Sequence, residues 1–166
     1  MKDKIGNISS FTSQTIHELR DTIWAMNKNE ISLEDLQARI LSFTQKAKTA
    51  VPQINFTIHN NVNTNEIFSS VVGINIFRVV QEAINNAIKY ADAKNIEVNL
   101  EFDNQLFTAS ILDDGKGFDL QTVTLGNGLS NMEKRMSEIG GKIIIDSKPN
   151  KGTIIKLSLK TKANNV

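Results

Sequence analysis

Apolar residues recur along this chain with two different periods. Over residues 8–26 and 33–47 they return every three or four positions, which is the spacing of one face of an α-helix. Ser32 is placed as an N-cap, with an acidic residue three positions on, as in a capping box. Pro52 ends this pattern, because a proline disfavours helical backbone in the residue before it. Residues 1–50 are therefore predicted to form one long helix or two collinear helices.

After residue 52 the apolar residues alternate in short runs, interrupted by two further helical stretches. Strict alternation is typical of strands with one buried face. The runs "NIEVNLEF" and "LFTASILD" are separated by three polar residues and predict a hairpin. The predicted strands are 54–59, 95–102, 106–113, 142–147 and 153–160, and the predicted helices are 66–91 and 129–139.

The helix predicted at 66–91 has two distinct faces. Ile76, Val79, Val80, Ala83 and Ala87 recur at helical spacing and indicate a stripe that faces the core. At about 100° per residue, a second set falls within an arc of roughly 60° on another side. That polar set is Glu82, Asn86 and Lys89. An acid, an amide and an ammonium in this grouping form either a solvated face or one wall of a site.

Composition excludes several classes of protein. The 166 residues are 40% hydrophobic, carry a formal net charge of +1 and contain no cysteine. This favours a globular domain and gives no electrostatic case for nucleic acid as a partner. It excludes disulfides and cysteine-ligated zinc. No apolar run reaches the roughly 18 residues of a membrane-spanning helix.

Glycines concentrate in the second half of the chain, where seven of the nine lie between Gly115 and Gly152. The strand ending at Asp113 runs directly into "DGKG". A carboxylate fixed at a strand end can accept a hydrogen bond from an exocyclic amine such as that of adenine. Gly115 and Gly117 would let the backbone approach a flat ring closely. Taken alone, the same residues are also typical of a turn.

Two more glycine motifs allow a functional and a structural interpretation. Gly126 and Gly128 precede a predicted helix, whose free N–H groups and dipole would suit a phosphate. The alternative is a flexible loop with a capped helix. Gly152 and Thr153 open the last strand, and the alternative there is a hairpin turn.

In this order, the motifs resemble the ATP-binding domain of the GHKL superfamily of histidine kinases, gyrases, chaperones and MutL. The polar helix is similar to its N box, "DDGKGFD" to its G1 box, "GNGLSNMEKR" to its G2 box and "KGTIIKLSL" to its G3 box. The resemblance covers about residues 54–160. "FRVVQEAINNAIKYADA" is similar to histidine kinases of the NarX/DesK-like group, and the short interval between Gly117 and Gly126 implies a short ATP lid.

The resemblance implies an α+β fold, a two-layer α/β sandwich with a mixed sheet backed by helices and an N-terminal helical extension. Residues 1–50 resemble the second dimerisation and phosphotransfer helix, which would be incomplete here. Residues 51–166 would be the catalytic ATP-binding domain.

Residue roles carried over from this family form two groups. For the phosphates, the resemblance implies that Asn86 coordinates Mg²⁺, Lys89 contacts phosphate, and Glu82 assists the attacking imidazole as base or orienter. For the rest of ATP, it implies that Asp113 binds the adenine amine with help from Thr153, and that Tyr90 lies near the nucleotide. It also implies close approach at Gly115 and Gly117 and a phosphate frame made by Gly126, Gly128 and Leu129.

The expected function is that of the catalytic domain of a two-component sensor histidine kinase. It would use Mg-ATP to phosphorylate a histidine for relay to a response regulator receiver domain. His17, in "HELR", resembles a phosphoacceptor motif, but Asp21 and Thr22 replace the usual Thr-Pro. Only 86 − 17 = 69 residues separate His17 from Asn86, too few for the returning partner helix. The acceptor is therefore expected outside this chain, and autophosphorylation is not expected.

Further expectations concern the setting of the chain. Homodimerisation is expected through the helical region, with this part cytoplasmic and the whole protein anchored in the membrane. Two alternatives stay open at this point. One is a serine kinase of the anti-sigma-factor type, which has the same fold, and the other is a nucleotide-binding module without turnover.

Overall fold

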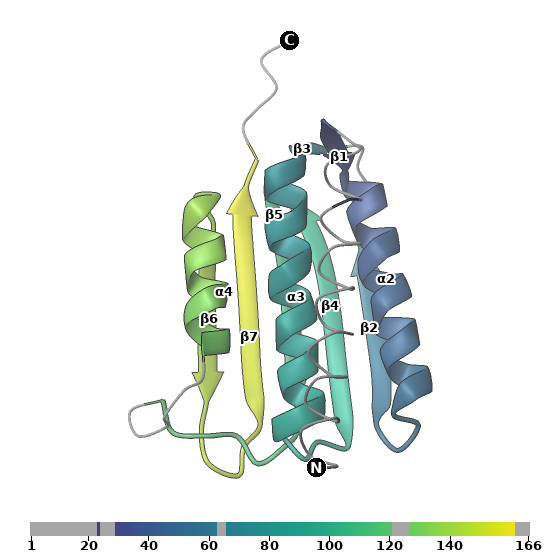
Figure 1. Ribbon diagram of the computed structural model, residues 1–166, viewed down its shortest axis with the longest axis vertical. Helices are drawn as coiled ribbons and strands as arrows, with labels where there is room; N and C mark the ends of the chain where they lie inside the picture. Colours follow the sequence, from purple (N-terminus) through teal and green to yellow (C-terminus); the bar gives the residue numbers. More distant parts are fainter. Residues whose placement is uncertain (1–22, 24–28, 63–65, 121–126, 162–166) are drawn as a thin grey trace, which may run out of the picture.

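The computed structural model describes residues 23, 29–62, 66–120 and 127–161. Within these residues, three helices lie against one face of a five-stranded sheet (Figure 1). The helices are α2 (Leu33–Ala50), α3 (Ser70–Tyr90) and α4 (Asn127–Glu138), and the strands of the sheet are β2 (Asn55–Asn61), β4 (Asn95–Asp103), β5 (Leu106–Asp113), β6 (Lys142–Ser147) and β7 (Thr153–Lys160). The expected two-layer α+β sandwich is confirmed.

The sheet has the strand order β2-β4-β5-β7-β6. β2 pairs with β4 in parallel, and every other pair is antiparallel, so the sheet is mixed as expected. α3 lies in the connection between the two parallel strands. Such a connection needs a dozen or more residues and is usually helical.

α3 forms where the apolar stripe predicted a helix. Ser69 caps its N-terminus, and the Ser69 side chain accepts a hydrogen bond from the Val72 N–H at 3.3 Å. The whole stripe of Ile76, Val79, Val80, Ala83 and Ala87 is buried in the core. The sheet supplies the facing half, because Ile96, Val98 and Leu100 on β4 alternate with polar residues and are buried too.

The N-terminal part of the described chain differs from the expected single helix or pair of collinear helices. Residues 30–32 form a strand, β1 (Glu30–Ser32), which pairs antiparallel with β3 (Ile67–Ser69). β3 also replaces the first turn of the helix predicted at 66–91. Ser32 caps α2 as predicted, since its side chain accepts from the Asp35 N–H at 3.0 Å. Helical periodicity cannot reveal a three-residue strand whose partner lies more than thirty residues away.

α2 packs on α3 and shares its core. Leu33, Leu36 and Ile40 have no exposed surface, and the ring of Phe43 meets that of Phe77 edge-on at 6.1 Å between centroids. The division at residue 50 stays a prediction. No described helix combines the length and apolarity that crossing a membrane would need.

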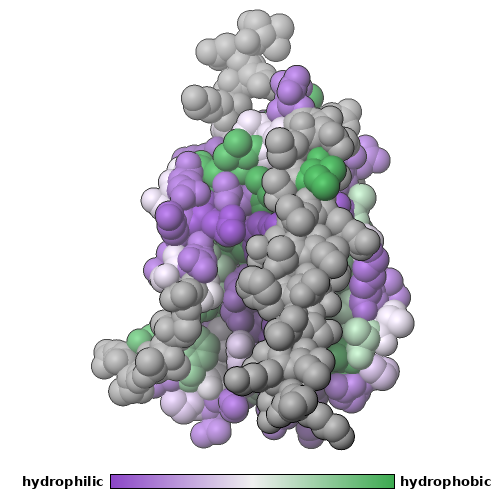
Figure 2. Space-filling view, in the orientation of Figure 1, coloured by the Kyte–Doolittle hydropathy of each residue, from purple (hydrophilic) through white to green (hydrophobic). Residues whose placement is uncertain are grey.

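α4 lies over β6 and beside α3, and it has two unlike faces. Met132 and Met136 are buried, whereas Glu133, Lys134 and Glu138 are exposed. Figure 2 shows this outer side of α4 as a largely hydrophilic surface. The helix is therefore amphipathic, with only its inner face in the core.

Candidate functional site

A row of side chains crosses the sheet at the end where β4 begins and β5 ends. Ile96 on β4 pairs with Asp113 on β5, Asp113 pairs with Thr153 on β7, and Thr153 pairs with Ser147 on β6. Each continues the buried, helix-facing positions of its own strand. Along β5, β6 and β7 the inward-facing residues are apolar except at the strand end that lies in this row, where they are Asp113, Ser147 and Thr153. A carboxyl and two hydroxyls therefore lie side by side at the edge of the core.

Asp113 is half-buried, and its surroundings act on its pKa in both directions. Burial raises the pKa above its ordinary value, and this is the largest effect. Hydrogen bonds from the Gly115 N–H and the Thr153 backbone lower it, the negative charge of Asp114 raises it, and the Thr153 hydroxyl lowers it. The Gly115 N–H lies 2.9 Å from Oδ1 of Asp113. A carboxylate held in this way keeps accepting capacity for a ligand.

Asp114, the next residue, has the opposite environment. Its Oδ1 accepts from the backbone N–H groups of Lys94 and Asn95 at 2.8 and 2.9 Å, and its Oδ2 accepts from the Asn95 side chain at 2.6 Å. These bonds, with those to Asn95 foremost, lower the pKa of Asp114. Asp114 therefore fastens the end of β5 to the turn that leads into β4, and the sequence reading assigned it no role.

Ser147 joins three parts of the site through one buried hydroxyl. Its Oγ accepts from the Phe118 N–H at 2.9 Å, lies 3.0 Å from Oγ1 of Thr153, and donates to the Gly152 carbonyl at 3.2 Å in one arrangement. Ser147, like Asp114, was not predicted from the sequence. The signal was available, because Ser147 is a polar residue in the inward-facing register of an alternating strand.

The glycines of the site are required by the protein's own backbone. A Cβ on Gly115 would collide with the carbonyl oxygen of Ala91, and one on Gly152 would collide with that of Asp113. Gly117 and Gly152 also have positive φ values of 54° and 72°, a region that side chains disfavour. Among the described residues, this close packing joins strands and loops of the site to one another, and the approach of Gly115 and Gly117 to a ligand stays a prediction.

A second cluster joins α3 to the start of α4. A Cβ on Gly128 would lie 2.5 Å from Oε1 of Glu82 and 3.5 Å from Nδ2 of Asn86. Glu82 and Asn86 are both half-buried. Glu82 and Asn86 on the polar arc of α3 therefore face the N-terminus of α4, and the backbone N–H groups and dipole of a helix N-terminus favour a negative group.

The remaining predicted site residues lie as follows. Lys89 and Tyr90 are exposed at the end of α3, and Tyr90 keeps 65% of its surface accessible. Leu129 is buried in the core, so only its backbone can face a ligand. Gly126 lies outside the described residues, as does His17.

A metal site made by the protein alone is not found in the part of the chain that the structure describes, which contains no cluster of three or more His, Asp or Glu residues. Asn86 offers an amide oxygen, a ligand type that Mg²⁺ accepts. Mg²⁺ commonly takes one or two protein ligands and completes its shell with water and the phosphates of its nucleotide. The residues present fit an ion that arrives with a nucleotide.

These features define a two-layer α+β domain with an acidic strand end, a polar helix face and a glycine-led helix. The chain belongs to the family of histidine kinase-, DNA gyrase B- and HSP90-like ATPases, whose model matches residues 72–163. The relatives and structural neighbours that it matches include histidine kinases.

Two curated relatives match nearly the whole chain. The histidine-protein kinase/phosphatase DegS of Brevibacillus brevis is 32% identical over 94% of this chain and 40% of its own length. The oxygen sensor histidine kinase NreB of Staphylococcus carnosus is 30% identical over 95% of this chain and 45% of its own length. The chain thus spans less than half the length of these relatives.

Solved structures show the same fold. The Acinetobacter baumannii histidine kinase AdeS superimposes with a TM-score of 0.68 at 19% identity, over 96% of this chain and 82% of that one. The catalytic domain of histidine kinase ThkA gives 0.62 at 20% identity, over 79% and 93%. At these identities the likeness concerns the fold alone.

Proposed function

We propose that this chain is the ATP-binding catalytic part of a two-component sensor histidine kinase. It would bind Mg-ATP and transfer the γ-phosphate to a histidine outside residues 1–166, for relay to a response regulator. Membership of the ATPase family and the histidine kinase relatives support this proposal. Homodimerisation would use the region expected from the sequence to be a dimerisation segment, residues 1–50.

The row at the strand ends is suited to the base of the nucleotide. Asp113 would accept a hydrogen bond from the adenine amine, and Thr153 would hold the carboxylate in place. Its partly buried position would make that bond stronger than an exposed one. Tyr90, exposed at the end of α3, would lie near the nucleotide.

The observation that supports the proposed phosphate-binding part of the site is the close packing of Gly128 against Glu82 and Asn86. It brings a helix N-terminus to the polar wall of α3. Backbone groups of Gly128 and Leu129 would meet phosphate oxygens there, together with Lys89 and with Gly126 beyond the described residues. Asn86 would hold the Mg²⁺ ion, which supplies charge neutralisation at the phosphates.

Glu82 would act on the incoming histidine. Its carboxylate would accept the imidazole N–H, so that the other ring nitrogen attacks the γ-phosphorus. The bond to the bridging oxygen then breaks and ADP leaves. Most of the rate enhancement in such transfers comes from positioning and charge stabilisation.

Titration calorimetry of a non-hydrolysable ATP analogue with Mg²⁺ tests the binding site. We expect saturable binding in the parent chain and a loss of about tenfold to a hundredfold in Asp113→Asn, which lacks the charged acceptor. Asp103→Asn is the matched control, because Asp103 ends β4 at the other end of the β4–β5 pair. Failure of the parent to bind, or an equal loss in the control, would contradict the proposal.

Incubation with labelled Mg-ATP tests the destination of the phosphate. We expect no label on His17 of the isolated chain, and acid-labile label on the acceptor histidine of the longer protein. Phosphate on His17 would refute an acceptor outside the chain. Acid-stable phosphate on a serine of a partner would instead support the serine kinase alternative.

A further inference from the structure

We propose that Ser147 is a positioning residue of the candidate site, whose hydroxyl orients Thr153 toward Asp113 and ties the loop at Phe118 to the same row. This inference rests on the proposed function, in which Asp113 binds the nucleotide base. Ser147 itself would not touch the nucleotide. Its role would be to fix the two groups on either side of it.

The row geometry places Ser147 next to Thr153 and one strand further from Asp113. Asp113 pairs with Thr153 across β5 and β7, and Ser147 pairs with Thr153 across β6 and β7. Directly opposed residues on one face of a sheet have Cβ atoms about 5 Å apart. Ser147 and Thr153 are each 7% exposed, so water is a poor substitute partner for either hydroxyl.

The protons of this row can be followed one by one. The Phe118 N–H donates to Oγ of Ser147 at 2.9 Å, which leaves the single Ser147 proton to be donated elsewhere. When the Thr153 hydroxyl donates to Asp113, Oγ1 of Thr153 becomes an acceptor, and the Ser147 proton can be donated to it across 3.0 Å. All donors then point one way and end on a carboxylate, an arrangement in which each bond strengthens the next.

In the opposite arrangement the chain of hydrogen bonds ends on a backbone carbonyl and not on Asp113. If Thr153 donates to Ser147, the Ser147 proton goes to the Gly152 carbonyl across 3.2 Å, and Asp113 loses the hydroxyl donor. An ionised Asp113 favours the first arrangement, because a hydrogen bond to a charged acceptor is the stronger one. Ser147 therefore supports the ionised form of Asp113, the form that accepts from an amine.

Several described residues flank Asp113 in the chain and in the sheet. Asp114 follows it and carries the charge that opposes its ionisation. Ile96 on β4 and Thr153 on β7, the residues that flank it in the sheet, carry no charge. Gly115 supplies a backbone N–H. The hydroxyls of Thr153 and Ser147 are thus the groups near Asp113 that can donate in either of two directions.

The decisive measurement is the titration of the Asp113 carboxyl carbon by NMR, in the unliganded chain and in Ser147→Ala. We expect the alanine variant to titrate at higher pH and to bind the Mg²⁺-bound ATP analogue about threefold to tenfold more weakly at pH 7. Ser147→Thr, which keeps the hydroxyl, should restore the parent titration. Ser110→Ala is the matched control, because Ser110 lies on the open face of the sheet, the face turned away from the helices. Its Oγ accepts from Asn99 at 3.4 Å.

A double-mutant cycle with Thr153→Val separates positioning from general stability. If both hydroxyls act through one chain of bonds, Ser147→Ala should add almost nothing to the upward shift that Thr153→Val causes. Additive shifts, or a Ser147→Ala titration equal to the parent's, would overturn the inference. The NMR readout needs no nucleotide, so absence of binding in the parent would count against the proposed function and leave this test intact.

Discussion

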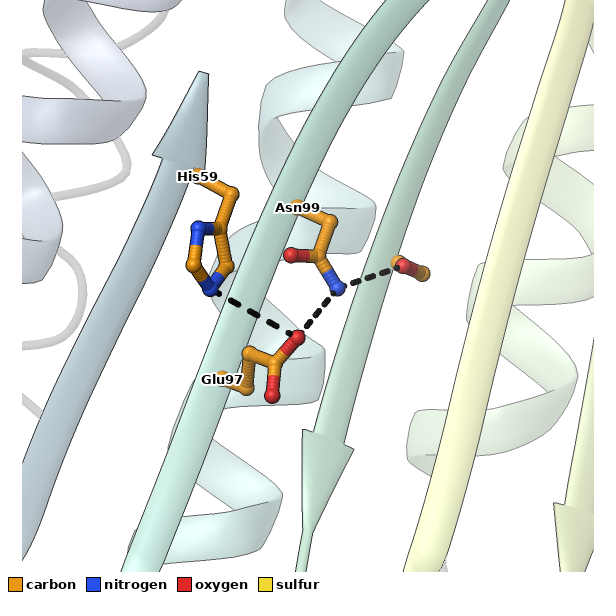
Figure 3. A network of polar contacts seen from close by, with 4 residues as sticks. His59, Glu97 and Asn99 are labelled. Atoms are coloured by element: carbon orange, nitrogen blue, oxygen red, sulfur yellow. Dashed lines mark hydrogen bonds and ion pairs between the residues drawn. The ribbon is translucent and has the colours of Figure 1, made fainter. Parts of the chain in front are cut away.

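The two faces of the sheet carry polar groups of the same kinds in unlike surroundings. On the open face, Figure 3 shows His59, Glu97 and Asn99 on neighbouring strands, with 3.9 Å between His59 Nε2 and Glu97 Oε1 and a 2.9 Å bond from Asn99 to the same oxygen. Their side chains are well exposed, 54% for His59 and 44% for Glu97. On the covered face, Asp113, Thr153 and Ser147 form a row at the edge of the core.

The two faces differ in how strongly neighbouring polar groups influence one another. Water competes for every group of the open network, so its members contribute little to stability and act on one another weakly. On the covered face burial removes that competition, and each hydrogen bond alters the properties of its neighbour. Four predictions test this contrast, and they are given in order of expected effect.

The largest effect is expected where the covered face meets the helices. Leu100→Ala removes a side chain with no exposed surface, and should lower the free energy of unfolding by about 2–5 kcal/mol. Glu101→Ala, its neighbour on the open face, should change it by less than about 0.5 kcal/mol. Denaturant titration of both variants checks this, and equal effects would contradict the contrast.

The next effect concerns backbone packing at the site. Gly152→Ala places a Cβ against the Asp113 carbonyl at a φ of 72°, and we expect a loss of about 2–3 kcal/mol. Gly140→Ala is matched in φ, at 70°, but has no atom within 4 Å of the added Cβ. It should lose about 1 kcal/mol. Thermal unfolding of the pair separates steric collision from backbone strain, and equal losses would rule out the collision.

The adjacent carboxylates should respond to pH with opposite signs. Asp114 has a lowered pKa in the folded chain, so its stabilisation is present above the ordinary pKa of 3.8 and is lost as pH falls through the folded value. Asp114→Asn should therefore lower stability at pH 7 by about 1 kcal/mol, a small value because the group is exposed. Asp113 has a raised pKa, so Asp113→Asn should raise the stability of the unliganded chain at pH 7.

Chemical unfolding at pH 7 and at acid pH checks both signs. The pair Asn95→Asp with Asp114→Asn exchanges donor and acceptor across the 2.6 Å bond, and it should recover part of the Asp114→Asn loss. No recovery would show that the charge at position 114, and not this side-chain bond, carries the effect.

The smallest effect is expected for the open network. His59→Ala removes an exposed partner 3.9 Å from Glu97, and should change the free energy of unfolding by less than about 0.5 kcal/mol at pH 7. Raising the salt concentration should leave even that difference close to zero. A loss comparable to that of Gly152→Ala would show that the open face is coupled after all.

Prediction from sequence worked best where one local rule decides the structure. The buried stripe of α3, the alternating strands and the Ser32 cap all follow from periodicity or from one capping bond. It failed at β1, because a three-residue strand depends on a distant partner in β3. For the site, the sequence placed Asp113 at a strand end and Glu82 with Asn86 on one helix face, and the structure agrees on both placements.

The two missed residues have a common reason. Asp114 and Ser147 act through partners nineteen or more residues away, or across a strand pair whose register the sequence does not display. A polar residue inside a turn-like or strand-like run gives no sign of which backbone groups it will meet. The ligand roles of the site residues remain predictions.

The candidate site draws on α3, β5, α4, β6 and β7, from Glu82 to Thr153, and no continuous segment contains it. A chain that has formed only the β4–β5 hairpin would have Asp113 but neither hydroxyl partner. Ligand affinity would therefore arise only after all strands of the sheet have paired. A ligand would then stabilise fully folded molecules by mass action and not partly folded ones. During synthesis or refolding after heat, the nucleotide would then stabilise only those molecules in which this domain has folded completely.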